Sequence, residues 1–271
     1  MSAKRFRLAR FSYPMSPMGL IVPIDHGLTL GPMAGIDSVR SLSRWISHPA
    51  ICGVIAHKGI AERLMEAGVL DGKGLMIHLN GMTTLSRDPD TKERLTTIEA
   101  AIRLGADAVS FQLNFSGQND AANLRLMGQV VDEASEFHVP VLAMIYDKAK
   151  SEPREAVSRQ RHLIRVATEL GCDAVKIAAA DPQSLPEILA GISDDIAVYL
   201  AGGSLAREEE FYELAHTAVR AGIRGLCVGR NVFGRSNVHE VLTQLRLLLA
   251  PKASLAVTEP RLERGIAYGP H

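Results

Sequence analysis

Eight short apolar runs rich in β-branched residues recur along the chain, and a longer segment separates each run from the next. Short buried strands alternating with longer helices are typical of a series of β-α-β units. The expected strands are the runs 20–25, 52–57, 74–79, 107–113, 140–146, 173–179, 197–202 and 225–229. Eight units match the strand number of a TIM (β/α)8 barrel, so we predict an α/β fold of that architecture.

The segments between the runs place apolar residues three and four positions apart, with polar residues between them. This spacing covers one face of a helix. Helices are therefore expected within 38–46, 96–104, 120–137, 154–170 and 209–221. An open, doubly wound sheet is the second choice of fold, but no GxGxxG sequence follows the first run, which counts against a dinucleotide-binding domain.

A weak internal repeat supports the barrel. The stretches 101–110, 167–176 and 218–227 each contain a helix end, a glycine, a short loop and a strand. Gly105, Gly171 and Gly222 suit the position just after a helix, where a positive φ favours glycine. Recurrence of one joint indicates a fold built from equivalent units.

Length and charge narrow the class of protein. The 271 residues suit one domain over 1–271, with an N-terminal segment, 1–18, and a C-terminal tail, 250–271. The 30 basic and 30 acidic residues balance, so neither nucleic acid nor a membrane is expected as a partner. Three widely spaced cysteines, a basic N-terminus without an apolar core, and the lack of a membrane-length apolar run favour a cytoplasmic protein.

Lys176 is the most informative polar residue. It lies inside the apolar run 173–179, and the C-terminal ends of barrel strands carry the reactive groups of such enzymes. Burial disfavours the ammonium form, so we expect a lowered pKa and a neutral amine able to attack a carbonyl. A lysine that reaches the rim, or pairs with a carboxylate on a neighbouring strand, is the alternative interpretation.

Strand alternation groups two further side chains with this lysine. Asp25 ends the first run and Tyr146 ends the fifth, and both lie on the same parity as inward-facing positions of their strands. An amine flanked by proton carriers is the set that Schiff-base chemistry requires. Alternatively, Asp25 is a turn or cap residue and Tyr146 is a core tyrosine with a bonded hydroxyl.

Glycines end the last two runs. Gly202 and Gly203 follow one strand, and Gly229 with Arg230 follows the next. Backbone N–H groups at such positions can approach a phosphate closely, and an arginine adds charge-assisted hydrogen bonds. Tight turns between strand and helix would also explain these glycines.

Other groups at the strand ends could bind substrate or metal. We include Lys58 and His26 among the substrate-binding residues, and we expect Lys58 to lie in the loop after the second run. His26, His57 and His78 end the first three runs and could meet as a zinc site. No short His-x-His or HExxH motif supports such a site, so we expect neither a metal nor a cofactor.

Several stretches, taken in order, resemble the archaeal-type class I fructose-bisphosphate aldolase superfamily, which includes deoxyribose-phosphate aldolase. They are IVPIDHG, AHKG, IHLNGMTTLS, LGADAVS, AMIY, DAVKIA, LAGG and VGRNVF. The resemblance extends from about Arg5 to the last helix. Within the superfamily it is greatest to the branch of 2-amino-3,7-dideoxy-D-threo-hept-6-ulosonate synthases.

The resemblance implies a TIM barrel in which Lys176 forms the Schiff base. Tyr146 would donate and accept protons, Asp25 would be a second acid–base group, and the glycine-rich strand ends would hold a sugar phosphate. Such enzymes are commonly ring-like homo-oligomers, often decamers. The synthase branch joins L-aspartate 4-semialdehyde to a keto-sugar phosphate fragment, and a related bacterial branch uses dihydroxyacetone phosphate with the same semialdehyde.

Two departures from the family pattern leave the substrate open. Asp147-Lys148-Ala149 stands where the family usually has Pro-Arg-Gly after the tyrosine, and Ile177-Ala178-Ala179 stands where a hydroxyl-bearing residue is common after the lysine. The leading hypothesis is a class I aldolase acting on a phosphorylated ketone. The alternatives are fructose 1,6-bisphosphate cleavage, acyl transfer by the same lysine, and a non-catalytic sugar-phosphate-binding barrel.

Overall fold

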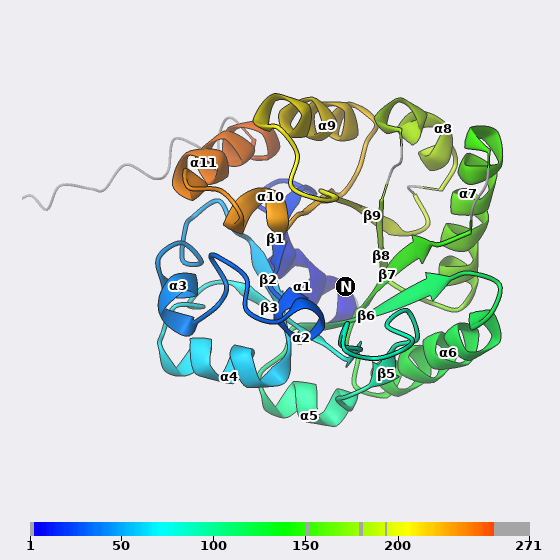
Figure 1. Cartoon of the computed structure of the whole chain (residues 1–271), viewed down its shortest axis with the longest axis horizontal. Coiled ribbons are helices and arrows are strands. Elements are labelled where there is room, and N and C mark those ends of the chain that lie inside the picture. The colour runs from blue at the N-terminus through cyan, green and yellow to red at the C-terminus, as the bar shows by residue number, and fades with distance from the viewer. Residues whose placement is uncertain (1–2, 150–151, 179–180, 193, 252–271) are drawn as a thin grey trace, which may run out of the picture.

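A closed barrel of eight parallel strands forms the centre of the molecule in the computed structural model, which describes residues 3–149, 152–178, 181–192 and 194–251 (Figure 1). The strands are β1 (Gly19–Pro23), β2 (Gly53–Ala56), β3 (Gly74–His78), β6 (Ala108–Phe115), β7 (Val141–Asp147), β8 (Ala174–Ile177), β9 (Ala197–Ala201) and β10 (Gly225–Cys227). Around the ring their order is β1-β10-β9-β8-β7-β6-β3-β2. The predicted (β/α)8 architecture and its eight strands are confirmed.

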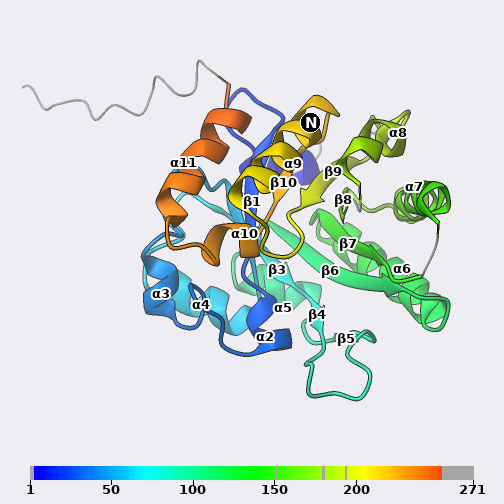
Figure 2. The ribbon, with the colours of Figure 1, turned by 45° about the horizontal axis from the view of Figure 1, so that its top comes forward.

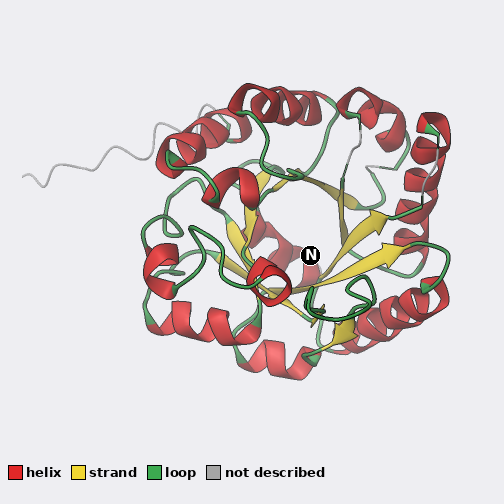
Figure 3. Ribbon diagram, viewed as in Figure 1, coloured by secondary structure: helices red, strands yellow, loops and turns green. Residues whose placement is uncertain are grey.

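Helices flank the barrel, most of them on its outside, whereas α1 and α2 overlie the barrel opening in this view (Figure 1 and Figure 3). They are α1 (Ala3–Leu8), α2 (His26–Leu30), α3 (Val39–Ser43), α4 (Lys58–Glu66), α5 (Ile98–Arg103), α6 (Asp120–Glu136), α7 (Pro153–Glu169), α8 (Leu185–Leu189), α9 (Glu208–Arg220), α10 (Arg230–Phe233) and α11 (Val238–Leu249), with short 3-10 turns η1 (Ala9–Phe11) and η2 (Pro182–Ser184). Each of the five expected helical segments contains a helix. The antiparallel pair β4 (Asn80–Gly81) and β5 (Glu93–Arg94) lies outside the barrel sheet.

The strands divide their side chains between two cores. Alternate residues such as Ile21, Met144 and Ala174 meet inside the barrel, whereas Val175 and Ile177 pack outward under the helices. Successive side chains of a strand point to opposite faces, which explains the division. The inward parity expected for the sixth run is therefore the one observed.

The N-terminal segment closes the end of the barrel where the strands begin. Phe11, at the end of η1, is fully buried and belongs to the inner cluster. A Cβ at Gly53 would lie 2.4 Å from Phe11 Cδ1, so the first position of β2 needs glycine to admit the ring. We expected an N-terminal segment from the sequence, but not that Phe11 of this segment would fill the barrel opening as a plug.

The basic residues of that segment bind carboxylates of the internal repeat. Lys4 Nζ lies 3.0 Å from Asp173 Oδ2, and Arg10 Nε lies 2.8 Å from Asp107 Oδ1. The same two aspartates accept backbone N–H groups of the preceding strands, from Leu75 to Asp107 and from Val141 to Asp173. The repeated aspartates thus fasten neighbouring strands to each other and to the N-terminal segment.

The repeated glycines occupy the conformation expected of them. Gly105, Gly171 and Gly222 have φ values of +79°, +86° and +87°. Each follows a helix and precedes a barrel strand, which confirms the predicted helix-to-strand joint.

Figure 2 separates the two ends of the barrel, with the N-terminus at one end and α2 and the β4–β5 pair at the other. Of the C-terminal tail expected over 250–271, only 250–251 belongs to the described residues. Among the helices of the described part, none is both long and apolar enough to cross a membrane.

Candidate active site

Lys176 lies on β8 and points into the barrel. Its residue exposure is 5 %, and it shares the inward face of its strand with Ala174. In the sheet register it lies beside Met144 of β7 and Tyr199 of β9, and its Nζ is 3.9 Å from Met144 Sδ. This burial is inconsistent with a lysine that reaches the solvent at the rim.

The expected lowering of the Lys176 pKa is wrong for this structure. Burial does lower the pKa, but attraction to Cys227, Tyr146 and Asp25 in their ionised forms outweighs burial, and the net pKa is raised. Burial raises the pKa of the Cys227 thiol to about 11, so this thiol is neutral near pH 7. The Asp25 carboxylate has a lowered pKa and therefore provides a negative charge near the lysine at neutral pH.

Tyr146 brings its hydroxyl to the same place. It lies near the end of β7, is half-buried, and packs against the inner cluster. The interaction with Tyr146 is one of the causes that raise the pKa of Lys176. The two residues are on adjacent strands, so the predicted convergence of this tyrosine and this lysine is observed.

Asp25 is the third residue of the predicted catalytic set, and it lies between β1 and α2. It occupies the N-cap position of α2, yet its side chain makes no capping hydrogen bond. Its Oδ1 is 3.5 Å from His26 Nδ1 and its Oδ2 is 3.8 Å from His78 Nε2. The carboxylate is thus directed into the barrel mouth, and the alternative interpretation as a helix cap fails.

The charge of Asp25 follows from its neighbours. Burial favours a raised pKa, but the positive forms of His78, His26, Lys176 and His57 outweigh burial and lower the pKa to about 2. Burial lowers the pKa of His78 to about 3 and also lowers the pKa values of His26 and His57. Since these imidazoles are mainly neutral near pH 7, Lys176 is the member of this set whose charge opposes the carboxylate.

His78 and Ser110 are site residues that were not among the catalytic and substrate-binding residues predicted from the sequence. His78 ends β3, is 2 % exposed, and its Nδ1 lies 2.8 Å from Ser110 Oγ of β6. The His57 ring contacts the His78 ring edge-on, with centroids 5.2 Å apart. Ser110 orients His78, whose other nitrogen faces Asp25. A hydroxyl within an otherwise apolar strand was the available sequence signal.

The zinc alternative finds no geometric support. Among the described residues, no three His, Cys, Asp or Glu side chains form a group that could hold a metal ion. His57 and His78 contact each other, whereas His26 packs edge-on against Phe233 at 5.4 Å. The three histidines therefore surround Asp25 from different directions and share no centre.

The glycine-rich ends of β9 and β10 lie next to each other, as predicted. Gly203 has a φ of +70°, and a Cβ at Gly202 would lie 2.9 Å from Val228 Cγ1. Asn231, which is fully buried, donates from Nδ2 to the carbonyl oxygens of Gly202 and Ser204 at 2.7 and 2.8 Å. This amide links the loop after β9 to the start of α10. Asn231 was not among the site residues predicted from the sequence.

Arg230 and His26 lie at the edge of these segments. Arg230 begins α10, and its buried Nε lacks a hydrogen-bond partner within the described structure. Its charge is one cause of the lowered pKa of His26, after burial. A Cβ at Gly229 would lie 2.9 Å from His26 Cε1, so this glycine lets the imidazole approach. Arg230 therefore places a cationic group beside the backbone of the glycine segments.

Lys58 does not lie in a loop. It is the first residue of α4, it is exposed, and its Nζ donates to the carbonyl oxygen of Leu95 at 3.0 Å. The strand ends earlier than expected, at Ala56, and the helix begins as soon as the chain leaves the barrel. The side chain thus fastens α4 to the segment before α5.

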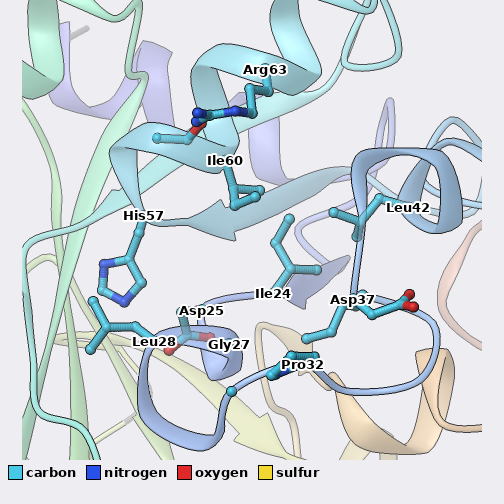
Figure 4. Close-up of a pocket in the computed structure, with 13 residues that line it drawn as sticks. Ile24, Asp25, Gly27, Leu28, Pro32, Asp37, Leu42, His57, Ile60 and Arg63 are labelled. Carbon is cyan, nitrogen blue, oxygen red and sulfur yellow. The ribbon is translucent and has the colours of Figure 1, made fainter.

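A cavity of about 440 Å³ lies beside Asp25, between the segment after β1 and the start of α4 (Figure 4). Apolar side chains, including Ile24, Leu42 and Ile60, line most of it, and His57 lines it as well. Asp25 therefore interacts with Lys176 and also lines this cavity. The cavity is roomy enough for a small substrate.

Comparison with known proteins places this geometry among aldolases. Residues 19–235 match the family model described as DeoC/LacD family aldolase. The chain is 33 % identical to 2-amino-3,7-dideoxy-D-threo-hept-6-ulosonate synthase 1 of Archaeoglobus fulgidus, over 92 % of each protein. It is 29 % identical to 2-amino-4,5-dihydroxy-6-oxo-7-(phosphonooxy)heptanoate synthase of Streptomyces griseus, over 85 % of this chain and 84 % of that one.

Solved structures agree. An archaeal fructose-1,6-bisphosphate aldolase, with its catalytic lysine covalently bound to the carbinolamine intermediate, superposes with a TM-score of 0.79 at 25 % identity. The match covers 90 % of this chain and 98 % of the other. The resemblance inferred from the sequence motifs is confirmed.

Proposed function

The chain belongs to the DeoC/LacD family of aldolases, and we propose that it uses Lys176 to form a Schiff base with a phosphorylated ketone and then joins that ketone to an aldehyde. The observation that carries the proposal is a single lysine, buried inside the barrel wall, that lies beside Tyr146 and within the field of the Asp25 carboxylate. An aldolase that forms an imine needs these three functions at one point.

The first step must remove a proton from the lysine. The pKa of Lys176 is raised, and an ammonium group cannot attack a carbonyl, so a proton must leave the ammonium form before the amine attacks the ketone. The attack gives a carbinolamine, which loses water to form an iminium ion. We assign the proton transfers of this stage to Tyr146 because it lies on the neighbouring strand and interacts with the lysine, and the Asp25 carboxylate stabilises the cationic iminium.

Carbon–carbon bond formation follows from the iminium ion. Loss of a proton from the carbon next to the iminium gives an enamine, whose electron pair attacks the carbonyl carbon of the aldehyde. The aldehyde oxygen takes a proton as its π bond breaks, and water then hydrolyses the new iminium to release the ketone product and the amine. Asp25, which borders both the lysine environment and the adjoining cavity, is positioned to exchange a proton at this stage.

The phosphate of the ketone is assigned to the ends of β9 and β10. Gly202 and Gly203 are at least partly exposed and carry no Cβ that would block an anion from their backbone, Gly229 lies beside them, and Arg230 supplies a positive charge with a buried donor that has no partner in the described structure. His26 lies against Gly229 and adds a polar group to this edge. The barrel's last two strands are a common phosphate site.

The name of one relative suggests which aldehyde accepts the ketone. The Streptomyces griseus protein is named for a seven-carbon product with a 6-oxo group, a 4-hydroxyl group and a phosphonooxy group on carbon 7. An aldol reaction that forms the bond between carbons 4 and 5 joins dihydroxyacetone phosphate to L-aspartate 4-semialdehyde. We propose this semialdehyde as the acceptor, in biosynthesis of aromatic or aminohydroxybenzoate-type compounds.

Trapping of the intermediate tests the proposal. Incubation with dihydroxyacetone phosphate and borohydride should reduce the iminium and add its mass to the peptide that carries Lys176. A Lys176→Met variant should remain unlabelled under the same conditions. An adduct on another lysine, or none on the wild-type protein, would refute the mechanism.

Cleavage of fructose 1,6-bisphosphate is the second candidate function, because a solved archaeal aldolase of that specificity matches nearly the whole chain. It uses the same lysine chemistry, so trapping does not distinguish the two. A coupled assay does. Cleavage at about 1–10³ s⁻¹, the usual range for enzymes, would favour this function, whereas condensation with L-aspartate 4-semialdehyde at such rates favours the first.

A further inference from the structure

A half-buried lysine lies over the barrel mouth on the side away from the assigned phosphate site. Lys92 immediately precedes β5, and Glu93 of β5 pairs with Gly81, just after the end of β3. In the barrel ring, β9 and β10 stand opposite β3 and β6. The two positive groups, Arg230 and Lys92, are therefore carried by opposite sides of the mouth.

The segment that carries Lys92 is fastened to the end of β6. Asn114 Nδ2 donates to the backbone oxygen of Asp90 at 2.8 Å and to its Oδ1 at 3.3 Å. Asn119 donates to Thr91 Oγ1 from the other side. Asn114 is itself buried and pairs in register with Tyr146, so the segment is anchored directly to the strand ends of the candidate active site.

Lys92 has no carboxylate partner at bonding distance. Its Nζ donates to the neutral carbonyl oxygen of Pro89 at 2.7 Å, while the nearby Asp90 carboxylate pairs with Lys148 at 3.3 Å. Within the described residues, no carboxylate lies within 4.0 Å of the Lys92 ammonium. An ammonium group has three donors, so Lys92 can bind a further acceptor.

The charges that face Lys92 come from both the segment and the active site. Burial lowers its pKa, Asp90, Asp25 and Asp88 raise it, and Lys148 lowers it, with a lowered pKa as the net result. The Lys92 charge also reaches His78. Lys92 thus interacts with Asp25 and His78 of the candidate active site, and burial is the largest cause of its lowered pKa.

We infer that Lys92 binds the anionic group at the far end of the acceptor aldehyde, so that the substrate spans the barrel mouth from a phosphate at β9 and β10 to a second anion at β3 and β6. This inference rests on the proposed aldol condensation, because the position is defined relative to a ketone bound on Lys176. A carboxylate and a phosphate share the chemistry that Lys92 recognises. Lys148 acts differently, since its Nζ already pairs with the Asp90 carboxylate.

Kinetics of Lys92→Met with three acceptors test the inference. Dihydroxyacetone phosphate is held constant, and the acceptor is L-aspartate 4-semialdehyde, D-glyceraldehyde 3-phosphate or uncharged propanal. Loss of a charge-assisted hydrogen bond should raise the KM for a charged acceptor about tenfold or more. The KM for propanal should stay unchanged, and Lys92→Arg should restore most of the loss. The larger effect identifies carboxylate or phosphate as the natural group.

The matched control is Arg87→Met, which removes a positive charge from the same segment at an exposed position. An equal rise in KM in this variant, or an equal rise for propanal in Lys92→Met, would overturn the inference, because either result indicates a general change in the segment. Borohydride trapping of dihydroxyacetone phosphate on Lys176 should be unchanged in Lys92→Met. Loss of trapping in the wild-type protein would instead contradict the proposed function, so the two failures are distinguishable.

Discussion

At the end of the barrel where the strands begin, an aromatic ring fills the opening and the charged side chains at its edge are paired, whereas at the other end buried polar groups lack partners. Phe11 is fully buried, and Lys4 and Arg10 bind carboxylates of the internal repeat. Asp25 Oδ1 and His26 Nδ1, at the opposite end, are buried without a hydrogen-bond partner in the described structure. One end is arranged for stability, while the other retains unsatisfied groups that a substrate can bind.

Removal of the Lys176 amine at the open end of the barrel should have the largest effect, and it should affect turnover while leaving the fold intact. Lys176→Met should lower turnover by more than about 10³-fold, because the variant cannot form the covalent intermediate. Steady-state kinetics measure the loss, and circular dichroism should show that the barrel remains folded. Retention of substantial turnover would mean that the open end of the barrel does not use this amine.

Truncation of Phe11, which closes the other end of the barrel, should affect stability and leave turnover nearly unchanged. Phe11→Ala should lower the free energy of unfolding by about 3–5 kcal/mol, because it leaves a cavity where the ring fills the barrel. Urea denaturation measures the change, and kcat at a temperature where the variant is folded should stay within about twofold of the wild-type value. Phe6→Ala, at a position that is 71 % exposed, is the matched control and should change stability little. An equal loss of kcat and stability in Phe11→Ala would show that the two ends are not separable.

Neutralisation of Asp25 tests whether the carboxylate at the open end of the barrel controls the pKa of Lys176. The carboxylate favours the Lys176 ammonium, so Asp25→Asn should lower the lysine pKa, and the pH at which borohydride trapping reaches half its maximum should fall. Turnover should still drop by about 10²- to 10⁴-fold if Asp25 transfers a proton. Asp71→Asn, at an exposed position, should leave the pH profile unchanged. An upward shift in Asp25→Asn would contradict the assigned charge pair.

The smallest effect is expected from the ion pairs around the plug. Arg10→Gln removes the partner of Asp107 at a partly exposed position, where such a pair contributes at most about 1 kcal/mol. Thermal denaturation should show a small decrease, with turnover unchanged. A decrease as large as that of Phe11→Ala would show that charge pairing, and not the aromatic ring, closes this end.

Much of the site follows from sequence periodicity. Successive side chains of a strand point to opposite faces, so the positions of Lys176 and Tyr146 in their strands required both to point inward, and parallel strands bring their ends to one mouth. The glycines at Gly202 and Gly229 meet for the same reason. Asp25 lies beyond the last residue of β1, so its direction depended on a turn that alternation does not describe.

Other features depended on contacts between distant segments. Lys58 looked like a loop residue because Gly59 follows it, but α4 begins there and directs its side chain to Leu95. The pairing of His78 with Ser110 joins two strands, and Asn231 joins two loops. The sequence gives each residue type, whereas its partner depends on how the barrel closes.

The sequence by itself determined the order of strands and helices, the inward parity of the reactive residues and the family, because these properties depend on short-range periodicity and on motifs read in order. Only the tertiary structure decided the direction in which the pKa of Lys176 shifts. Burial alone lowers this pKa, but the closed barrel brings Cys227, Tyr146 and Asp25 near the lysine, and their interactions together outweigh burial.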